Sequence, residues 1–363
     1  MSFGKFLLRS FAAALLATAP ILAGASLQAD PMAPTSSAKD RIVSPLATIS
    51  ITVADLADTR KFFQGALGLI PTDVSVTGKE ARRLAQHWGL PPSDRLNILL
   101  FANPYAPDSA RVRAVEVRKE LPSGRPELSS RYVGPLGFGL PMTEIPQREE
   151  IVTAMGFKST AGISRMNFAR ADGSTYPISE IHFRAPDDIL VLGVDRGEQA
   201  QIGPVDPVLE MGGVAYSSFL VEDLERSGAF LRDVLGLELR RQTTFRSAGS
   251  GGGMQDMRKG EEVAFNQWFS PGARSGYMVE MKLLDGGRMP PRSSGFATRG
   301  IAAYTFTTED LDLIAKRWRA YGGAPRPIFK GHIPGYGRAR AMMLMSPDGM
   351  PVEIIELRPA SGS

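Results

Sequence analysis

Cysteine is missing altogether from the 363-residue chain. Disulfide bonds, thiolate metal ligands and a cysteine nucleophile are therefore excluded. A bacterial periplasm is compatible with this composition, because disulfides are permitted there but not required. Histidine is almost as scarce, since the whole chain has three, which are His87, His182 and His332. A metal site in this protein would have few nitrogen ligands available.

A large excess of either charge is also missing. The chain has 42 lysines and arginines against 38 acidic residues, a formal net charge of +4. Lys5 and Arg9 at the N-terminus supply two of those positive charges. This balance gives no electrostatic reason to expect a nucleic acid or a membrane surface as partner. No G-x-S-x-G or nucleotide-binding glycine motif occurs either, so neither a hydrolase nor a nucleotide cofactor is indicated.

The N-terminus has the pattern of a secretory signal. Lys5 and Arg9 precede an apolar run, Phe11 to Ala25, which ends in the small residues Ala23-Gly24-Ala25. A charged start, a short apolar centre and a small-residue end predict a signal peptide over 1–29. The alternative is a membrane anchor, but the run is short for a span of about 20 residues. We therefore expect a periplasmic or secreted protein without a membrane span after signal removal, with a flexible lead-in over 30–45.

An internal repeat organises the rest of the chain. Residues 55–69 read DLADTRKFFQGALGL and residues 223–237 read DLERSGAFLRDVLGL. Asp55 and Asp223 are placed to cap a helix, and the glycine of each LGL is placed to end it. A strand-like run precedes each helix and about three strands follow it. The repeated unit is therefore a βαβββ module.

Two fainter copies bring the number of modules to four. They begin at Leu136–Met142 and at Ile301–Thr308. The sequence predicts an α+β protein in which consecutive modules pair, giving one domain over 46–195 and another over 213–358. Prolines and glycines in PVDPVLEMGG indicate a linker, placed at 196–212.

The repeated helix pattern and the C-terminal SPDGMPVEIIEL resemble the vicinal-oxygen-chelate superfamily, which includes glyoxalases, bleomycin-resistance proteins and extradiol dioxygenases. The resemblance covers nearly everything after the signal segment. It implies two tandem glyoxalase-like open barrels, each built from two βαβββ modules around a cleft.

The resemblance also implies where metal ligands would lie. They stand on the first strand of each module, about seven residues before the capping aspartate, and on the last strand as a glutamate. In the second barrel these positions hold Tyr216, Ala303, Glu280 and Glu353; in the first they hold Thr48, Glu116, Gly137 and approximately Leu192. Because none is histidine, ordinary extradiol cleavage and glyoxalase I chemistry are disfavoured.

Glu280 and Glu353 are expected as a facing carboxylate pair in the second barrel. They either bind a divalent metal ion through oxygen or supply a general base, and a purely structural role is the alternative. The cofactor is therefore either none or a divalent metal. His332 and Tyr336 complete the predicted catalytic set with these glutamates, while Arg338, Tyr216 and Trp268 are the predicted substrate-binding residues.

Each of the remaining candidates also has a structural interpretation. Trp268 on a strand is more often core, and an exposed arginine is the common explanation of Arg338. His87, in a helical insert, is expected to be solvated or to cap the helix. For His182, on a strand, a structural role is favoured.

Three roles remain open at this point, and one of them is a structural or accessory role in which the first barrel mediates contacts between modules or subunits. The favoured one is an exported, divergent glyoxalase-like enzyme that acts on a small oxygenated or aromatic molecule by proton abstraction, isomerisation or lyase chemistry. The alternative is a metal-free binding or sequestration protein of the bleomycin-resistance type. The expected partner is a small molecule in either case, and the protein is expected to be a monomer or a homodimer.

Overall fold

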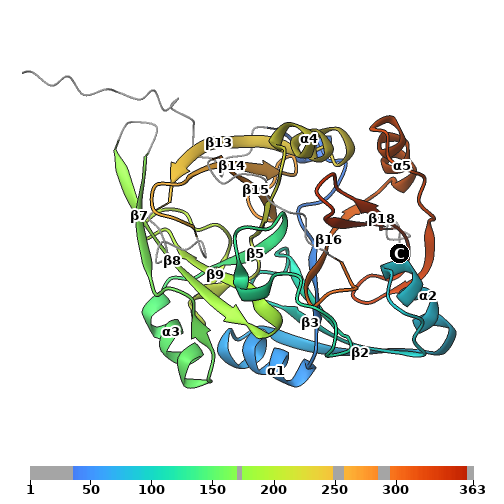
Figure 1. Ribbon diagram of the computed structural model, residues 1–363, viewed down its shortest axis with the longest axis horizontal. Coiled ribbons are helices and arrows are strands. Elements are labelled where there is room, and N and C mark those ends of the chain that lie inside the picture. The colour runs from blue at the N-terminus through green and yellow to red at the C-terminus, as the bar shows by residue number, and fades with distance from the viewer. Residues whose placement is uncertain (1–35, 170–173, 248–256, 285–294, 358–363) are drawn as a thin grey trace, which may run out of the picture.

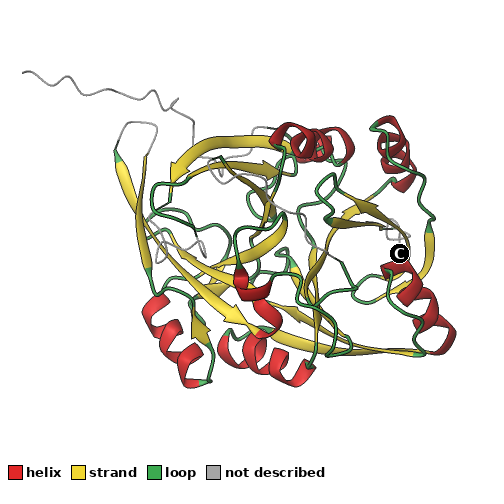
Figure 2. Cartoon of the chain, viewed as in Figure 1, coloured by secondary structure: helices red, strands yellow, loops and turns green. Residues whose placement is uncertain are grey.

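The computed structural model describes residues 36–357, apart from 170–173, 248–256 and 285–294 (Figures 1 and 2). The expected signal peptide and residues 30–35 of the expected lead-in lie outside these residues, whereas 36–45 lie within them. Two large mixed sheets with helices around them form the molecule, which confirms the α+β class. Within the described part, no helix is long and apolar enough to cross a membrane.

The first and last modules form one sheet, called here the terminal-module sheet. Its eight strands run in the order β17-β18-β19-β16-β1-β4-β3-β2. β1 and β16 meet antiparallel at its centre, with Thr48 opposite Thr305. The strands are β1 (Thr48–Val53), β2 (Ile70–Thr77), β3 (Arg95–Ala102), β4 (Arg111–Glu116), β16 (Gly300–Thr308), β17 (Phe329–Ile333), β18 (Gly337–Met345) and β19 (Pro351–Glu356).

The second and third modules form the other sheet, called here the central-module sheet. Its strands run in the order β13-β14-β15-β12-β5-β9-β8-β6, and β7 pairs with β8. β5 and β12 meet antiparallel at its centre, with Gly139 opposite Tyr216. The strands are β5 (Gly134–Pro141), β6 (Lys158–Ser159), β7 (Ser164–Ala169), β8 (Thr175–Ala185), β9 (Ile189–Asp195), β12 (Tyr216–Leu220), β13 (Glu238–Arg246), β14 (Glu262–Phe269) and β15 (Tyr277–Leu283); a hairpin of β10 (Val205–Asp206) and β11 (Met211–Gly212) lies between the modules.

This strand order corrects the expected pairing of modules. The sequence predicted that modules one and two share a barrel over 46–195, and modules three and four a barrel over 213–358. Instead, modules one and four form one sheet, and modules two and three form the other. Every module presents the same first-strand edge, so a sequence repeat does not reveal which copies pair.

Helices of consecutive modules do pack together. The helix of module one contacts that of module two, and the helix of module three contacts that of module four through Phe230 and Trp318 (Figure 1). The helices are α1 (Leu56–Arg60) continued by η2 (Lys61–Ala66), α2 (Gly78–Trp88), α3 (Ile145–Ala154), α4 (Leu224–Ala229) continued by η5 (Phe230–Val234) and α5 (Leu311–Ala320), with short turns η1 (Ala38–Asp40), η3 (Pro126–Leu128) and η4 (Pro186–Asp188).

The predicted helix boundaries are confirmed in both strong repeats. The Asp55 side chain accepts hydrogen bonds from the backbone N–H groups of the first turn of α1, and Asp223 does the same for α4. Gly68 and Gly236 follow these helices at φ +69° and +71°, a conformation that favours glycine.

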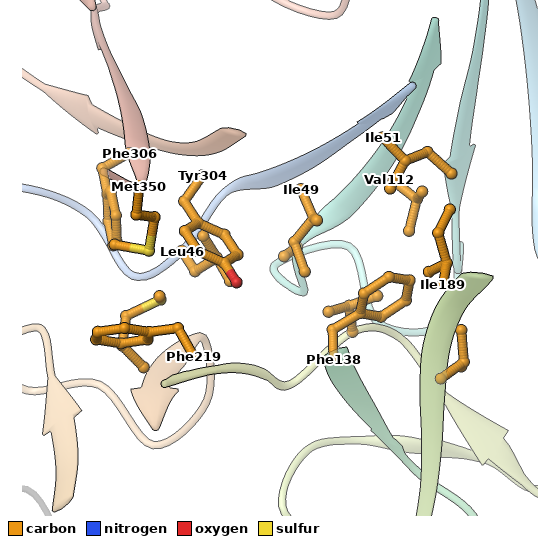
Figure 3. Packing of buried hydrophobic residues seen from close by; sticks show 14 of the residues in the cluster. Leu46, Ile49, Ile51, Val112, Phe138, Ile189, Phe219, Tyr304, Phe306 and Met350 are labelled. Carbon is orange, nitrogen blue, oxygen red and sulfur yellow. The ribbon is translucent and has the colours of Figure 1, made fainter. Parts of the chain in front are cut away.

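A shared hydrophobic core joins the two sheets. Ile49 and Ile51 of β1 pack near Phe138 of β5, and Tyr304 of β16 lies over Phe219 of β12 (Figure 3). The sheets therefore meet through one face each, called here the convex face. Their opposite faces, called concave, are lined by separate clusters of buried residues. Any site on a concave face belongs to one sheet only.

Candidate functional site

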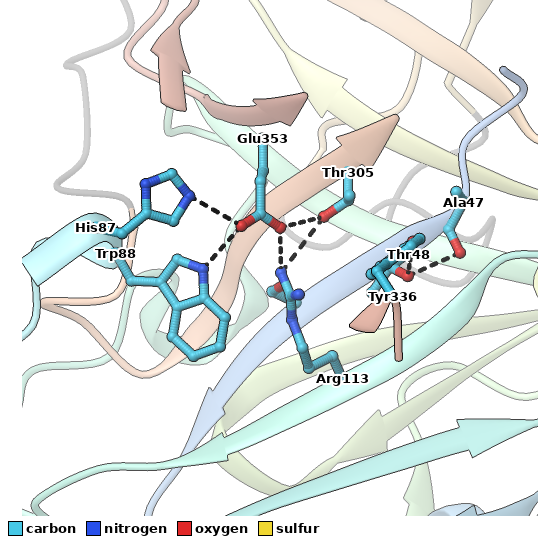
Figure 4. A network of polar contacts seen from close by, with 9 residues as sticks. Ala47, Thr48, His87, Trp88, Arg113, Thr305, Tyr336 and Glu353 are labelled. Carbon is cyan, nitrogen blue, oxygen red and sulfur yellow. Dashed lines mark hydrogen bonds and ion pairs between the residues drawn. The ribbon is translucent and has the colours of Figure 1, made fainter. Parts of the chain in front are cut away.

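Glu353 lies at the centre of a buried polar network on the concave face of the terminal-module sheet (Figure 4). Its Oε2 accepts hydrogen bonds from Arg113 Nη2 at 2.5 Å and from Thr305 Oγ1 at 3.0 Å. Its Oε1 accepts one from Trp88 Nε1 at 2.9 Å and lies 3.2 Å from His87 Nε2. Both carboxylate oxygens are thus fully engaged by protein groups.

The strand register brings the charged members of this network together. β4 and β19 flank the two central strands, with Arg113 opposite Ser50 and Glu353 opposite Thr305. Arg113 Nε and Nη2 donate to Ser50 Oγ at 3.0 and 2.7 Å. The Arg113–Glu353 ion pair therefore spans the line where the first and fourth modules meet.

Helix α2 covers this ion pair. It is an insertion in module one that ends in His87 and Trp88, and the guanidinium carbon of Arg113 lies 4.7 Å from the centre of the Trp88 ring. The His87 ring stacks on Phe329 with centroids 4.8 Å apart. His87 is therefore buried against the sheet, and the expectation of a solvated or capping histidine was wrong.

The electrostatics make Glu353 a poor proton acceptor. Burial alone would raise its pKa, but Arg113 and His87 outweigh burial and hold the pKa well below the usual range of a glutamate. A general base needs a pKa near the working pH. The carboxylate of Glu353 is instead ionised at neutral pH and serves as the counter-ion of Arg113.

Tyr336 lies on the same concave face. Its Oη shares a 2.6 Å hydrogen bond with Thr48 Oγ1 (Figure 4). The guanidinium carbon of Arg111 lies 4.8 Å from the centre of its ring. Burial raises the pKa of the Tyr336 phenol, so it stays protonated at neutral pH.

His332 and Arg338 are not brought to Glu353. They stand opposite each other on β17 and β18. Phe329 and Ile333, their neighbours in alternation, pack on the concave side. Because successive side chains of a strand point to opposite faces, His332 and Arg338 project to the other side. Arg338 is exposed, which matches the structural interpretation of this residue.

Glu280 lies on the other sheet and on its convex face. It stands opposite Phe219, a residue of the shared core. Its Oε2 accepts hydrogen bonds from Asn266 Nδ2 at 3.0 Å and Trp268 Nε1 at 2.9 Å. The expected facing pair of Glu280 and Glu353 was therefore wrong, because modules three and four lie in different sheets and Val279 holds the concave position on β15.

Trp268 shares the environment of Glu280. It belongs to the shared core, and its ring packs so closely on Gly228 of α4 that a Cβ there would lie 2.8 Å from Cζ2. Burial is the largest influence on Glu280 and raises its pKa. Trp268 is therefore a core residue that anchors a buried carboxyl group, as the structural interpretation of this tryptophan held.

Tyr216 does face the concave side of the central-module sheet. Its ring stacks on Tyr277 with centroids 5.2 Å apart, and Tyr277 stacks on Phe269 at 4.5 Å. The Tyr216 ring crosses β5 at Gly139, where a Cβ would lie 2.1 Å from Cε1 of the tyrosine. Glycine is required there so that the tyrosine can lie flat across the sheet.

Polar side chains lie at both ends of this row of rings. Tyr216 Oη donates to Glu180 Oε1 at 3.5 Å. His182, which is 3% exposed, has Nε2 3.4 Å from Glu180 Oε2, yet neither ring nitrogen has a hydrogen-bond partner among the described residues. Gln267 Oε1, on β14, also lacks one there. His182 therefore faces the same side as Tyr216.

Two arginines lie close to the phenols of this face. Arg196 Nη2 donates to Tyr176 Oη at 2.9 Å. Burial and, to a smaller extent, Arg196 lower the pKa of Arg241, while Tyr176 and Tyr277 raise it. Burial raises the pKa of Tyr277 although both arginines oppose it. The face thus combines aromatic rings with cationic groups.

The donor sets of the two concave faces do not fit a divalent metal ion. Among the described residues, no three or more His, Asp or Glu side chains gather closely enough to hold one. At Glu353 the neighbouring group is a guanidinium, which has five N–H donors and no lone pair for a metal. The metal site predicted from Glu280 and Glu353 is therefore not assembled.

Sequence reasoning missed the partners of Glu353. The run RVRAVEV suggested Glu116 as the last-strand residue, but Glu116 is exposed and Arg113 is the buried one. An arginine inside an apolar strand was the available signal, because such a residue is seldom buried without a partner. His87 and Trp88 carried no comparable signal.

The protein thus consists of four βαβββ modules that form two sheets, and the two sheets pack against each other through a shared hydrophobic core. Residues 213–354 match the model of the Glyoxalase/Bleomycin resistance protein/Dioxygenase superfamily. This part of the chain belongs to that superfamily, and the fold is that of the superfamily over both sheets. The matched segment contains modules three and four, which lie in different sheets.

Solved structures share the fold over most of the chain. Glyoxalase I from Zea mays is similar with a TM-score of 0.56 and 15% identity, covering 88% of this chain and 94% of that one. A putative dioxygenase from Bacillus subtilis has a TM-score of 0.52 and 14% identity, covering 88% and 87%. No curated protein sequence matches the chain.

Proposed function

We propose that the chain is a metal-independent small-molecule-binding protein whose ligand lies on the concave face of the central-module sheet. The observation that carries this proposal is the pair of buried polar side chains, His182 and Gln267, with atoms that no described residue hydrogen-bonds. Buried polar atoms in proteins are nearly always paired. His182 lies beside Glu180, to which Tyr216 donates, and Gln267 stands opposite Val279 on the strand of Tyr277, which supports a ligand as the partner.

The rings suggest the shape of the ligand. Tyr216, Tyr277 and Phe269 form a stack that spans three neighbouring strands. Small-molecule sites are commonly lined by aromatic side chains with a few polar groups that fix orientation. A planar, aromatic or conjugated molecule is the natural partner of such a surface.

The charges suggest its functional group. Arg196 and Arg241 bring two guanidinium groups to this face, whereas Glu180 brings one carboxylate. Guanidinium groups bind carboxylates and phenolates through charge-assisted hydrogen bonds. We therefore infer a ligand with an acidic group. Glu180 and Arg241 are each only partly buried, so part of this face is exposed to solvent.

The alternative of a divergent glyoxalase-like enzyme finds less support. Its proposed acid–base group, Glu353, is locked by Arg113 and covered by α2. Glyoxalase I and the putative dioxygenase are named as enzymes, but at about 15% identity their likeness concerns the fold alone. A binding role uses the face where His182 and Gln267 have polar atoms without a hydrogen-bond partner among the described residues.

The test is a thermal-shift titration of the chelator-treated, full-length chain. Benzoate and hydroxybenzoates should raise the midpoint of unfolding, because a ligand that binds only the folded state stabilises it. Benzylamine and benzyl alcohol, which lack an acidic group, should have no such effect. Added divalent metal ions should not change the benzoate affinity.

Two tyrosine variants locate the site. Tyr216→Ala should weaken binding at least tenfold, while Tyr336→Phe on the other sheet should leave it unchanged. If the reverse is found, or if every compound binds only with a metal ion, the proposal fails. Turnover of a bound compound, lost in Tyr216→Ala, would favour an enzyme at this same face.

The location and the oligomeric state of the protein are proposals as well. We propose export to the periplasm or the medium on the basis of the N-terminal residues, which mass spectrometry of the mature N-terminus would test. We also keep the expectation of a monomer or a homodimer, which light scattering would resolve.

A further inference from the structure

We propose that the guanidinium of Arg113 is a built-in cation that occupies the metal position of the terminal-module sheet, so that this sheet holds a latent metal site closed by an arginine. The inference is independent of the function proposed for the other sheet. It rests on the position, the charge and the neighbours of Arg113.

The position follows from the symmetry of the sheet. β4 is the last strand of module one and β19 the last strand of module four, and each lies beside the first strand of its own module. Arg113 and Glu353 therefore project from corresponding strands on the same face, and they meet across the centre. A metal ion held by both modules would have to lie between these two side chains.

The charge balance is already complete at that place. Arg113 and Glu353 are both fully buried and lie 2.5 Å apart, so the single carboxylate is neutralised. A divalent ion beside Glu353 would come within a few ångströms of the guanidinium, and like charges repel strongly at such distances in a buried site. Arg113 therefore competes directly with any metal ion for Glu353.

The neighbours are what make the site latent. His87 Nε2 lies 3.2 Å from Glu353 Oε1, so a nitrogen ligand and a carboxylate already lie side by side. Imidazole nitrogen and carboxylate oxygen are ordinary ligands of Zn²⁺, Ni²⁺ and Mn²⁺. Replacing Arg113 by histidine would remove the cation and add a third ligand at the same place.

The experiment compares the chelator-treated wild-type chain with Arg113→His, each titrated with Zn²⁺, Ni²⁺ and Mn²⁺. The wild type should retain no stoichiometric metal and show no thermal shift. Arg113→His should retain one ion per chain, and its unfolding midpoint should rise by about 5 °C at saturating metal.

The double variant Arg113→His/Glu353→Gln is the matched control. It should lose the gained metal binding, because it lacks the carboxylate ligand. A folded Arg113→His chain without metal binding, or one whose metal persists in the double variant, would overturn the proposal.

If Arg113→His does not fold under any condition, metal binding by the wild-type protein provides the test. One equivalent of metal in the wild type that disappears in His87→Gln would show that Arg113 does not exclude metal, and the inference would be lost. Wild-type protein that stays metal-free at millimolar Zn²⁺, with unchanged His87 ring resonances in NMR spectra, supports it.

Discussion

Glu353 and Glu280 stand in corresponding last-strand motifs, VEIIE and VEMKL, yet the two sheets treat them in opposite ways. Both side chains are fully buried. Glu353 has Arg113 as a charged partner, and its pKa falls well below the usual range. Glu280 accepts hydrogen bonds from the neutral donors Asn266 and Trp268, and burial raises its pKa. Burial is common to both, so the partner decides the protonation state.

The two sheets also differ in the residues that stand opposite each other on their two central strands. Two threonines, Thr48 and Thr305, face each other in the terminal-module sheet, and the space above them is filled by charged groups and by α2. In the central-module sheet, Tyr216 faces Gly139 and its ring covers the glycine. One scaffold thus carries a sealed ionic cluster on one sheet and a row of aromatic rings on the other.

Removing the charge of Glu353 should produce the largest effect. Glu353→Gln leaves the buried guanidinium of Arg113 uncompensated, so the free energy of unfolding should fall by about 3–5 kcal/mol. Urea denaturation at pH 7 measures it. The double variant Arg113→Met/Glu353→Leu should recover most of this loss, because well-packed apolar residues can replace a buried ion pair. A loss below about 1 kcal/mol for the single variant would contradict a buried ion pair.

A methyl group at Gly139 should produce an intermediate effect. Gly139→Ala places a Cβ against the Tyr216 ring, and overpacking of this kind costs about 1–3 kcal/mol. The same change at Gly203, where the nearest side-chain atom would be 3.3 Å away, should cost much less. Thermal unfolding of both variants measures the difference. Equal stabilities would mean that Tyr216 does not lie over the glycine.

Removing the charge of Glu280 should produce the smallest effect, of opposite sign. A raised folded-state pKa means that Glu280 favours folding fully below its unfolded pKa, and that this contribution is lost as pH rises through the folded pKa. Glu280→Gln should therefore stabilise the protein by about 1 kcal/mol at pH 8. The gain should vanish near pH 4, as unfolding curves at both pH values would reveal.

If the two glutamates differ as described, the contribution of Glu353 to stability must depend on pH in the opposite direction from that of Glu280. Its lowered pKa contributes stability above the unfolded pKa, and that contribution is lost as pH falls through the folded pKa. The difference in stability between wild type and Glu353→Gln should thus shrink on acidification. Parallel pH profiles for Glu280→Gln and Glu353→Gln would refute the distinction.

The repeat and the helix caps could be read from the sequence because they are local. Asp55 and Asp223 bind N–H groups of their own helices, and Gly68 and Gly236 act within one turn. The choice of partner for each module could not be read, because it depends on contacts between equivalent strand edges far apart in the chain.

The site was predictable only in part for the same reason. Glu353, Tyr336 and Tyr216 were expected around the cleft of one barrel, but they lie on the concave faces of two different sheets. Glu280 was assigned to the wrong face by one residue of register, which reverses the direction of every side chain on the strand. The pairing of Glu353 with Arg113 and His87 needed the three-dimensional arrangement of module one against module four.

The pairing of module one with module four also constrains the order in which the chain can fold. One edge of β1 pairs with β4 of its own module, but the other edge has no partner until β16 of the last module has been made. The central-module sheet joins neighbouring modules and is complete earlier. During synthesis from the N-terminus, module one must therefore remain unpaired while modules two and three assemble. The order of folding would run from the middle of the chain outward, with the ends joining last.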